Sequence, residues 1–256
     1  MTTMGTAARG SRARISAALA WAVLGVALAC AVAGLIAGPG YRIGWWSLGP
    51  AFQALRWAAI FGLGAAAVGL VAVLLALGTG ARRPMWNALA GLVIGLVVAA
   101  PPINMMRRAH QLPSIHDIST DIDNPPAFDA VVPLRHGARN PVEYVPATAA
   151  EQKKGYPDIA PAVLKLPPAQ AFARAEQAAR AMGWEIVAVD RQALRIEATD
   201  TTLMFGFKDD VVIRVRAHPD GSRVDIRSLS RVGGSDLGVN ANRIRGFMRK
   251  LGAGSR

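Results

Sequence analysis

Three long runs of apolar residues constrain the first part of this 256-residue chain more than any other feature. A helix needs about 20 apolar residues to cross the ~30 Å hydrocarbon core of a bilayer. Helices on soluble proteins carry one apolar stripe, whereas these runs are apolar all round. The pattern therefore predicts three transmembrane helices, and a buried helical hairpin of a soluble protein is the alternative. The runs contain no charged residue, are 19 to 23 residues long, and cover 15–37, 57–77 and 85–103.

Helix-breaking residues lie at the ends of these runs. We expect Gly38–Gly40 to end the first span and Pro101–Pro102 to close the third, with Arg82–Pro84 separating the second from the third. The glycine pairs Gly34/Gly38 and Gly91/Gly95 have the four-residue spacing that lets helices approach closely. Packing inside a three-helix bundle is the preferred interpretation, and a dimer face is the alternative.

The predicted spans contain no acidic, lysine or histidine residue. Transporters and pumps hold ions or relay protons with polar groups inside the membrane. We therefore interpret the three spans as an anchor whose partner is the lipid bilayer. The segment Ala27–Cys30 resembles a lipoprotein cleavage box, but the apolar run continues beyond it, so Cys30 is interpreted as a small apolar residue in a helix.

The distribution of charge predicts the orientation. The net charge is +12, but residues 1–110 hold nine arginines and no acid, and the remainder holds 20 cations and all 17 acids. Cytoplasmic loops carry more arginine and lysine than outer loops. With the N-terminus in the cytoplasm, five arginines lie inside (Arg9, Arg12, Arg14, Arg82, Arg83) and four outside (Arg42, Arg56, Arg107, Arg108). We therefore expect the C-terminal domain to be extracytoplasmic.

The C-terminal part begins with a segment rich in proline. Residues 111–168 contain ten of the chain's 16 prolines, which exclude a long helix or a central strand. Their apolar residues favour an extended arm packed on a domain over a disordered linker. The sequence therefore divides into three regions: a transmembrane anchor over 1–110, the arm over 111–168 and a domain over 169–256.

Hydrophobic periodicity after Pro168 predicts a small α+β domain with an antiparallel sheet. Its order is α-β-β-β-β-α. Alternation along the strands gives each of them one apolar and one polar face, and we expect the polar face to be solvated. The predicted elements are a helix over 169–182, strands over 184–190, 194–199, 211–217 and 223–229, and a helix from about 235 to 251.

One imidazole and several carboxylates lie at the start of the arm. His116, Asp117, Asp121 and Asp123 fall within eight residues and offer nitrogen and oxygen ligands to a divalent cation. Their spacing matches no calcium loop, and aspartate also stabilises turns by bonding to nearby backbone. The turn interpretation is preferred, and a metal or ligand site is the alternative.

Arginines recur on the polar faces of the predicted strands, where they offer a site for an anion such as a lipid head group. Glu197 and Asp225 share this face, so we prefer an ion-paired surface. Two glycines before Ser235 also suggest an anion site at a helix start, although capping by Ser235 is the preferred interpretation. The anion-binding candidates are Arg214, Arg216, Arg227, Arg231, Gly233, Gly234 and Ser235.

The sequence contains no signature of a catalytic site or a dinucleotide site, so we assign no catalytic residue and no cofactor. Asp209 and Asp210 are adjacent carboxylates that could suggest acid–base chemistry, but we expect them in a turn that enters the strand over 211–217. Consecutive side chains on a strand point to opposite faces, so the two need not share a site. A domain charge of +3 and few aromatic residues disfavour nucleic-acid binding.

Five separated blocks of the C-terminal part have a familiar pattern: Ile115–Pro126, Gly183–Val187, Phe207–Arg214, Ser228–Gly233 and Asp236–Arg245. Together they resemble the bacterial family called domain of unknown function 1499, over about residues 111–252. The resemblance implies a fold but no activity and no catalytic residue, and membrane segments are often fused to this domain. With the three spans, a bacterial family implies a protein of the bacterial inner (plasma) membrane.

These features favour a non-enzymatic membrane protein whose extracytoplasmic domain binds an envelope component or a protein partner. One alternative is a membrane-anchored, metal-dependent hydrolase that uses the His116–Asp123 segment. A weaker alternative is an assembly factor for another membrane protein. The sequence leaves the oligomeric state open.

Overall fold

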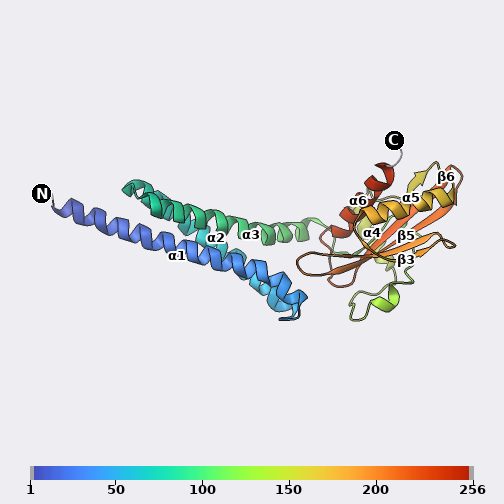
Figure 1. Cartoon of the computed structure of the whole chain (residues 1–256), viewed down its shortest axis with the longest axis horizontal. Coiled ribbons are helices and arrows are strands. Elements are labelled where there is room, and N and C mark those ends of the chain that lie inside the picture. The colour runs from blue at the N-terminus through green and yellow to red at the C-terminus, as the bar shows by residue number, and fades with distance from the viewer. Residues whose placement is uncertain (1–2, 254–256) are drawn as a thin grey trace. The chain divides into compact units, whose positions relative to one another are not determined.

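The computed structural model describes residues 3–253 and divides the chain into two units that meet at residues 107 and 108. The first unit is helical, and its last helix continues a few residues into the second (Figure 1). Its helices are α1 (Thr3–Arg42), α2 (Leu48–Thr79) and α3 (Arg82–Gln111). Each contains a segment long and apolar enough to span a membrane, which confirms three apolar helices at the N-terminus. The candidate spans are Ala13–Arg42, Leu48–Gly78 and Arg82–Gln111.

The prolines do not end the helices as expected. Helix α1 continues through Pro39, and helix α3 continues through Pro101 and Pro102. A proline removes one backbone donor, and membrane helices tolerate it because neighbouring groups satisfy the freed carbonyl. Helix α2 does end at a glycine, since Gly80 adopts a left-handed conformation (φ 70°) and donates its N–H to the Leu77 carbonyl.

Small residues bring the three helices together. An added Cβ at Gly95 would collide with the backbone carbonyl oxygen of Gly62 on α2, and one at Gly91 would lie 2.6 Å from Val23 Cγ1 on α1. Helix α3 therefore packs closely on both other helices, and the Gly91/Gly95 pair serves packing within the bundle. Gly34 has open space beside its Cα, so its pair with Gly38 makes no such contact there.

The second unit is a six-stranded antiparallel sheet with two helices on one face, which confirms the predicted fold class and its α-β-β-β-β-α order. Strands β3, β4, β5 and β6 form a meander, and β1 and β2 both pair with the outer edge of β6. The meander and its helices are α5 (Pro168–Ala181), β3 (Glu185–Asp190), β4 (Arg195–Thr201), β5 (Lys208–His218), β6 (Gly221–Ser230) and α6 (Val239–Ala253).

The hydrophobic core lies between the sheet and helices α5 and α6. Alternate strand residues such as Ile196, Ile213 and Ile226 point to this side and are buried. Phe172 of α5 and Phe247 of α6 cover them, and both rings are fully buried. The core therefore follows directly from the period-two pattern of the strands and the apolar stripes of the two helices.

The proline-rich arm crosses the second unit as an ordered segment. It contains β1 (Asp117–Ser119), the short 3-10 helix η1 (Val132–Leu134), α4 (Pro146–Gly155) and β2 (Ala162–Leu164). The two strands are short and lie at the sheet edge, where proline neighbours are tolerated. The ten-residue helix α4, with Pro146 at its start, was missed by the sequence analysis.

The close approach at Gly95 yields a stability prediction. We expect Gly95→Ala to lower the free energy of unfolding of the helical unit by about 1–3 kcal/mol, because the added methyl must push α3 away from the Gly62 carbonyl. Gly64→Ala is the matched control, since Gly64 on α2 has open space at its Cβ position. Titration of the full chain with dodecyl sulfate, followed by helical circular dichroism, measures both; equal losses would contradict the packing described.

Candidate functional site

The second face of the sheet is polar but not solvated, contrary to expectation. The arm lies over this face, and the carboxylates of Asp210 and Asp225 are fully buried. Glu197 is 1% exposed and accepts backbone N–H groups from Asp129 and Val131 of the arm. Antiparallel sheets often leave one face wet, but here the arm supplies the partners that these charges need.

Arg227 of β6 joins the arm to the sheet at the centre of this face. Its guanidinium makes a two-point ion pair with Asp117 of β1, with N–O distances of 2.9 and 2.7 Å. It also donates to the carbonyl oxygen of Val142 at 2.7 Å. The rings of Phe128 and Tyr144 lie 4.9 and 5.4 Å from the guanidinium carbon. Burial raises the pKa of Tyr144 to about 12.

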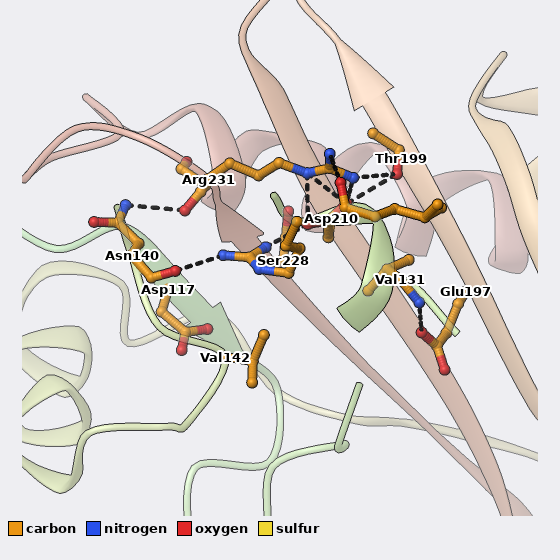
Figure 2. A network of polar contacts seen from close by, with 12 residues as sticks. Asp117, Val131, Asn140, Val142, Glu197, Thr199, Asp210, Ser228 and Arg231 are labelled. Atoms are coloured by element: carbon orange, nitrogen blue, oxygen red, sulfur yellow. Dashed lines mark hydrogen bonds and ion pairs between the residues drawn. The ribbon is translucent and has the colours of Figure 1, made fainter. Parts of the chain in front are cut away.

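A second cluster surrounds Asp210 of β5. Arg231 donates to both carboxylate oxygens, with a closest distance of 2.8 Å, and Thr199 donates its hydroxyl at 2.9 Å (Figure 2). Arg135 of the arm pairs with the same carboxylate. Arg231 also donates to the Leu134 carbonyl oxygen at 2.7 Å, so this cluster fixes η1 against the sheet.

A third cluster joins two carboxylates and three guanidiniums. Asp121 of the arm and Asp225 of β6 each pair with Arg214, Arg216 and Arg223, at N–O distances between 2.8 and 3.2 Å. Burial acts to raise the pKa of Asp121, but the backbone N–H of Asn124 and the neighbouring arginines outweigh it and lower that pKa. The carboxylate is therefore held in its charged form by its partners.

The four candidate metal ligands do not converge. Asp117 faces Arg227, Asp121 faces the three arginines of the third cluster, and Asp123 is exposed. The Nδ1 atom of His116 is buried without a hydrogen-bond partner, while its carbonyl oxygen accepts the N–H of Ser230. Within residues 3–253, no three histidine, cysteine, aspartate or glutamate side chains are grouped so that they could hold a metal ion.

The anion-binding candidates are likewise distributed over separate places. Arg214 and Arg216 lie together in the third cluster, Arg227 pairs with Asp117, and Arg231 pairs with Asp210. Each of the four guanidiniums therefore already faces a carboxylate. The preferred interpretation of an ion-paired face agrees with these contacts.

The loop before α6 differs from the capping prediction. Helix α6 begins at Val239, and Asp236 accepts the N–H groups of Gly238 and Asn240 at 3.0 and 2.6 Å. The Ser235 hydroxyl accepts the N–H of Leu237, at 3.2 Å. The expected capping role of Ser235 is therefore wrong, because the helix starts four residues later. Burial raises the pKa of Asp236.

The two glycines of this loop, Gly233 and Gly234, differ in their surroundings. The carbonyl oxygen of Gly233 accepts the side-chain amide of Asn140 from the arm at 2.9 Å, while Gly234 has open space at its Cβ position. The loop is thereby joined to the arm, and its backbone carbonyl rather than an N–H makes that contact.

Asp209 and Asp210 lie within β5 and not in the expected turn before it, and they point to opposite faces of the sheet. Asp209 pairs with Arg243 of α6 at 2.7 Å, on the helix side of the sheet. Arg243 and Arg135 were both missed by the sequence analysis. A polar residue on the inner face of α6 was a usable signal for Arg243, whereas nothing local distinguishes Arg135 from the other charged residues of the arm.

A family model described as a protein of unknown function (DUF1499) matches residues 117–251. The matched region is just over half of the 256-residue chain, begins at β1 and ends within α6. It therefore contains both the sheet and the arm that covers it, and the three apolar helices precede it. The resemblance seen in the sequence is confirmed. A comparison with curated proteins found no match.

The buried pair of Arg227 and Asp117 yields a second prediction. We expect Arg227→Met to lower the free energy of unfolding of the second unit by about 3–5 kcal/mol, because it leaves a buried carboxylate without its partner. The double variant Asp117→Leu/Arg227→Met should recover much of this loss, since no charge is then left unpaired. Guanidinium unfolding of the full chain in micelles, followed by circular dichroism, measures both variants.

Arg180→Ala is the control for that experiment. Arg180 is 58% exposed and pairs with Glu176 on the surface of α5, so its loss should change the stability by about 0–1 kcal/mol. Limited proteolysis with trypsin adds a local measurement. In Arg227→Met, but not in Arg180→Ala, release of the arm should expose cleavage sites after the arginines and lysines of the arm. An Arg227→Met variant as stable as Arg180→Ala would show that the arm is held by other contacts.

Proposed function

This chain belongs to the DUF1499 family of proteins of unknown function, and on that premise we propose that it is a non-enzymatic inner-membrane protein whose extracytoplasmic domain binds an envelope component or a protein partner. The three candidate membrane spans anchor the domain, and the α+β domain supplies the binding surface. The membrane is the immediate partner of the helical unit.

One observation carries the non-enzymatic part of this proposal. Three of the carboxylates that the sequence offers for acid–base or metal chemistry, Asp117, Asp121 and Asp210, face arginines beneath the arm, and the Asp210 side chain is fully buried. A catalytic carboxylate has to reach its substrate, at hydrogen-bond distance or through one water molecule. The ion pairs instead hold the arm and the sheet together, which suits a rigid binding module.

The anchor role rests on the composition of the spans. The three candidate spans contain no aspartate, glutamate or lysine, and these are residues with which transport proteins commonly relay protons or hold ions. The five-to-four arginine distribution supports a cytoplasmic N-terminus. Three spans then bring the second unit to the opposite side of the membrane.

The orientation can be measured with reporter fusions. Alkaline phosphatase fused to the C-terminus should be active, and a fluorescent protein that folds only in the cytoplasm should be dark there. The same two reporters fused in the short connection between α2 and α3 should give the reverse result, since this connection is on the cytoplasmic side. A bright C-terminal fluorescent fusion with an inactive phosphatase fusion would show that the orientation is inverted.

The metal content of the purified full chain separates a binding module from the hydrolase alternative. We expect no stoichiometric divalent metal by elemental analysis, and no change in thermal unfolding when a chelator is added. Asp123→Asn should behave like the unmodified chain, because Asp123 is exposed. A bound metal that disappears in both His116→Ala and Asp123→Asn would favour the hydrolase and overturn the proposal.

A further inference from the structure

A groove lies between helices α2 and α3, at the end of the helical unit where α2 begins and α3 ends. Its volume is about 640 Å³, which falls within the ~300–1,000 Å³ of ordinary small-ligand sites. All of its lining residues belong to the helical unit, so the groove is described without reference to the second unit. The walls are apolar except for one arginine, and they include Leu55, Arg56, Ile60 and Leu63 of α2 with Pro102 and Met106 of α3.

The groove lies beyond the point where the two helices pack most closely. At Gly62 and Gly95 the helices approach so closely that an added Cβ on Gly95 would collide with the Gly62 carbonyl oxygen. Seven residues further, about two turns along each helix, Leu55 of α2 and Pro102 of α3 lie on opposite walls of the groove. Met106 on the α3 wall is 64% exposed, so the described residues leave this wall partly uncovered.

Arg56 is placed at the level of the membrane surface. It comes directly before the uncharged run 57–77, whose length matches the about 20 residues needed to cross the hydrocarbon core. The next residue, Trp57, is 53% exposed, and tryptophan concentrates at the membrane interface. Ile60 and Leu63 follow one and two turns further into the span. The groove therefore has its cation at the depth of the lipid head groups and its apolar walls toward the hydrocarbon.

The helical unit cannot neutralise the charge of Arg56 by itself. The first acidic residue of the chain is Asp117, so the helical unit contains no aspartate or glutamate to pair with this guanidinium. A second copy packed face to face on the groove would bring another arginine and no acid, and opposed like charges are unfavourable. A lipid phosphate supplies the missing negative charge, and arginine binds phosphate through two parallel hydrogen bonds.

We propose that the α2–α3 groove binds one anionic phospholipid, with its phosphate group on Arg56 and an acyl chain along Ile60 and Leu63. Basic pockets between transmembrane helices are known to hold anionic lipid head groups. The acyl chain covers the apolar walls and fills the space between α2 and α3 beyond the glycine contact. The site belongs to the anchor, so it goes beyond the binding role proposed for the second unit and rests only on the membrane placement of the helices.

Native mass spectrometry of the full chain, released from detergent micelles that contain phosphatidylglycerol or phosphatidylcholine, tests this proposal. The two lipids differ in head-group charge, and the number of lipids retained per chain is counted. Arg56→Gln removes the cation, whereas Ile60→Trp narrows the apolar part of the groove and keeps the cation. Arg83→Gln is the matched control, because Arg83 is exposed near the opposite end of α3 and its loss changes the charge equally. Circular dichroism confirms the helices of each variant.

We expect the unmodified chain and Arg83→Gln to retain one phosphatidylglycerol several-fold more often than one phosphatidylcholine. Arg56→Gln should lose this preference, and Ile60→Trp should retain either lipid several-fold less often. Equal retention of the two lipids by the unmodified chain, or an unchanged preference in folded Arg56→Gln, would overturn the proposal. A dimer that Ile60→Trp dissociates would assign the groove to a second copy and overturn it as well.

Carbonate extraction of membranes tests the anchor separately. A chain that is washed from the membrane would contradict the anchor role itself. A chain that stays in the membrane but shows no lipid preference would contradict only the lipid site.

Discussion

The structure of the second unit depends on charges that are buried between the sheet and the arm. Arg227, Asp210 and Asp225 are shielded from solvent, and taking such groups out of water is costly unless each finds an opposite charge and further hydrogen bonds. The arm supplies Asp117 to Arg227 and Arg135 to Asp210, and its Asp121 binds the same three arginines as Asp225. Arm and sheet therefore depend on each other. Separating them would leave Arg227 without its carboxylate and Asp210 without one of its arginines.

The family match starts at residue 117, so it contains the arm as well as the meander and its two helices. A segment with ten prolines looks like a linker by composition, yet it contributes two edge strands, a helix and half of the ion pairs on one sheet face. The two faces of the sheet are closed by different means. Helices α5 and α6 bury apolar side chains on one face, and the arm neutralises charged side chains on the other.

The helical unit is stabilised by another kind of contact. Lipid tails are as apolar as the helices, so burying apolar surface contributes little free energy to helix association. Close packing of small residues stabilises the helical unit instead. Gly62, Gly91 and Gly95 provide that packing. The four-residue spacing of Gly91 and Gly95 indicated this packing from the sequence, whereas their partner Gly62 was not singled out. The prolines misled because they were interpreted by the rule for soluble helices, whereas Pro39, Pro101 and Pro102 lie within continuous membrane-type helices.

What the sequence determined on its own is local: three apolar spans, the alternation of each strand and the order of the elements. These follow from the fixed periods of helices and strands, which act between near neighbours. Only the tertiary structure decided that the arginine-rich face is dry and which carboxylate meets which guanidinium. The Asp117–Arg227 and Arg135–Asp210 contacts join residues 110 and 75 positions apart, and no periodicity links such distant positions. Their pairing is set by the path of the arm across the sheet.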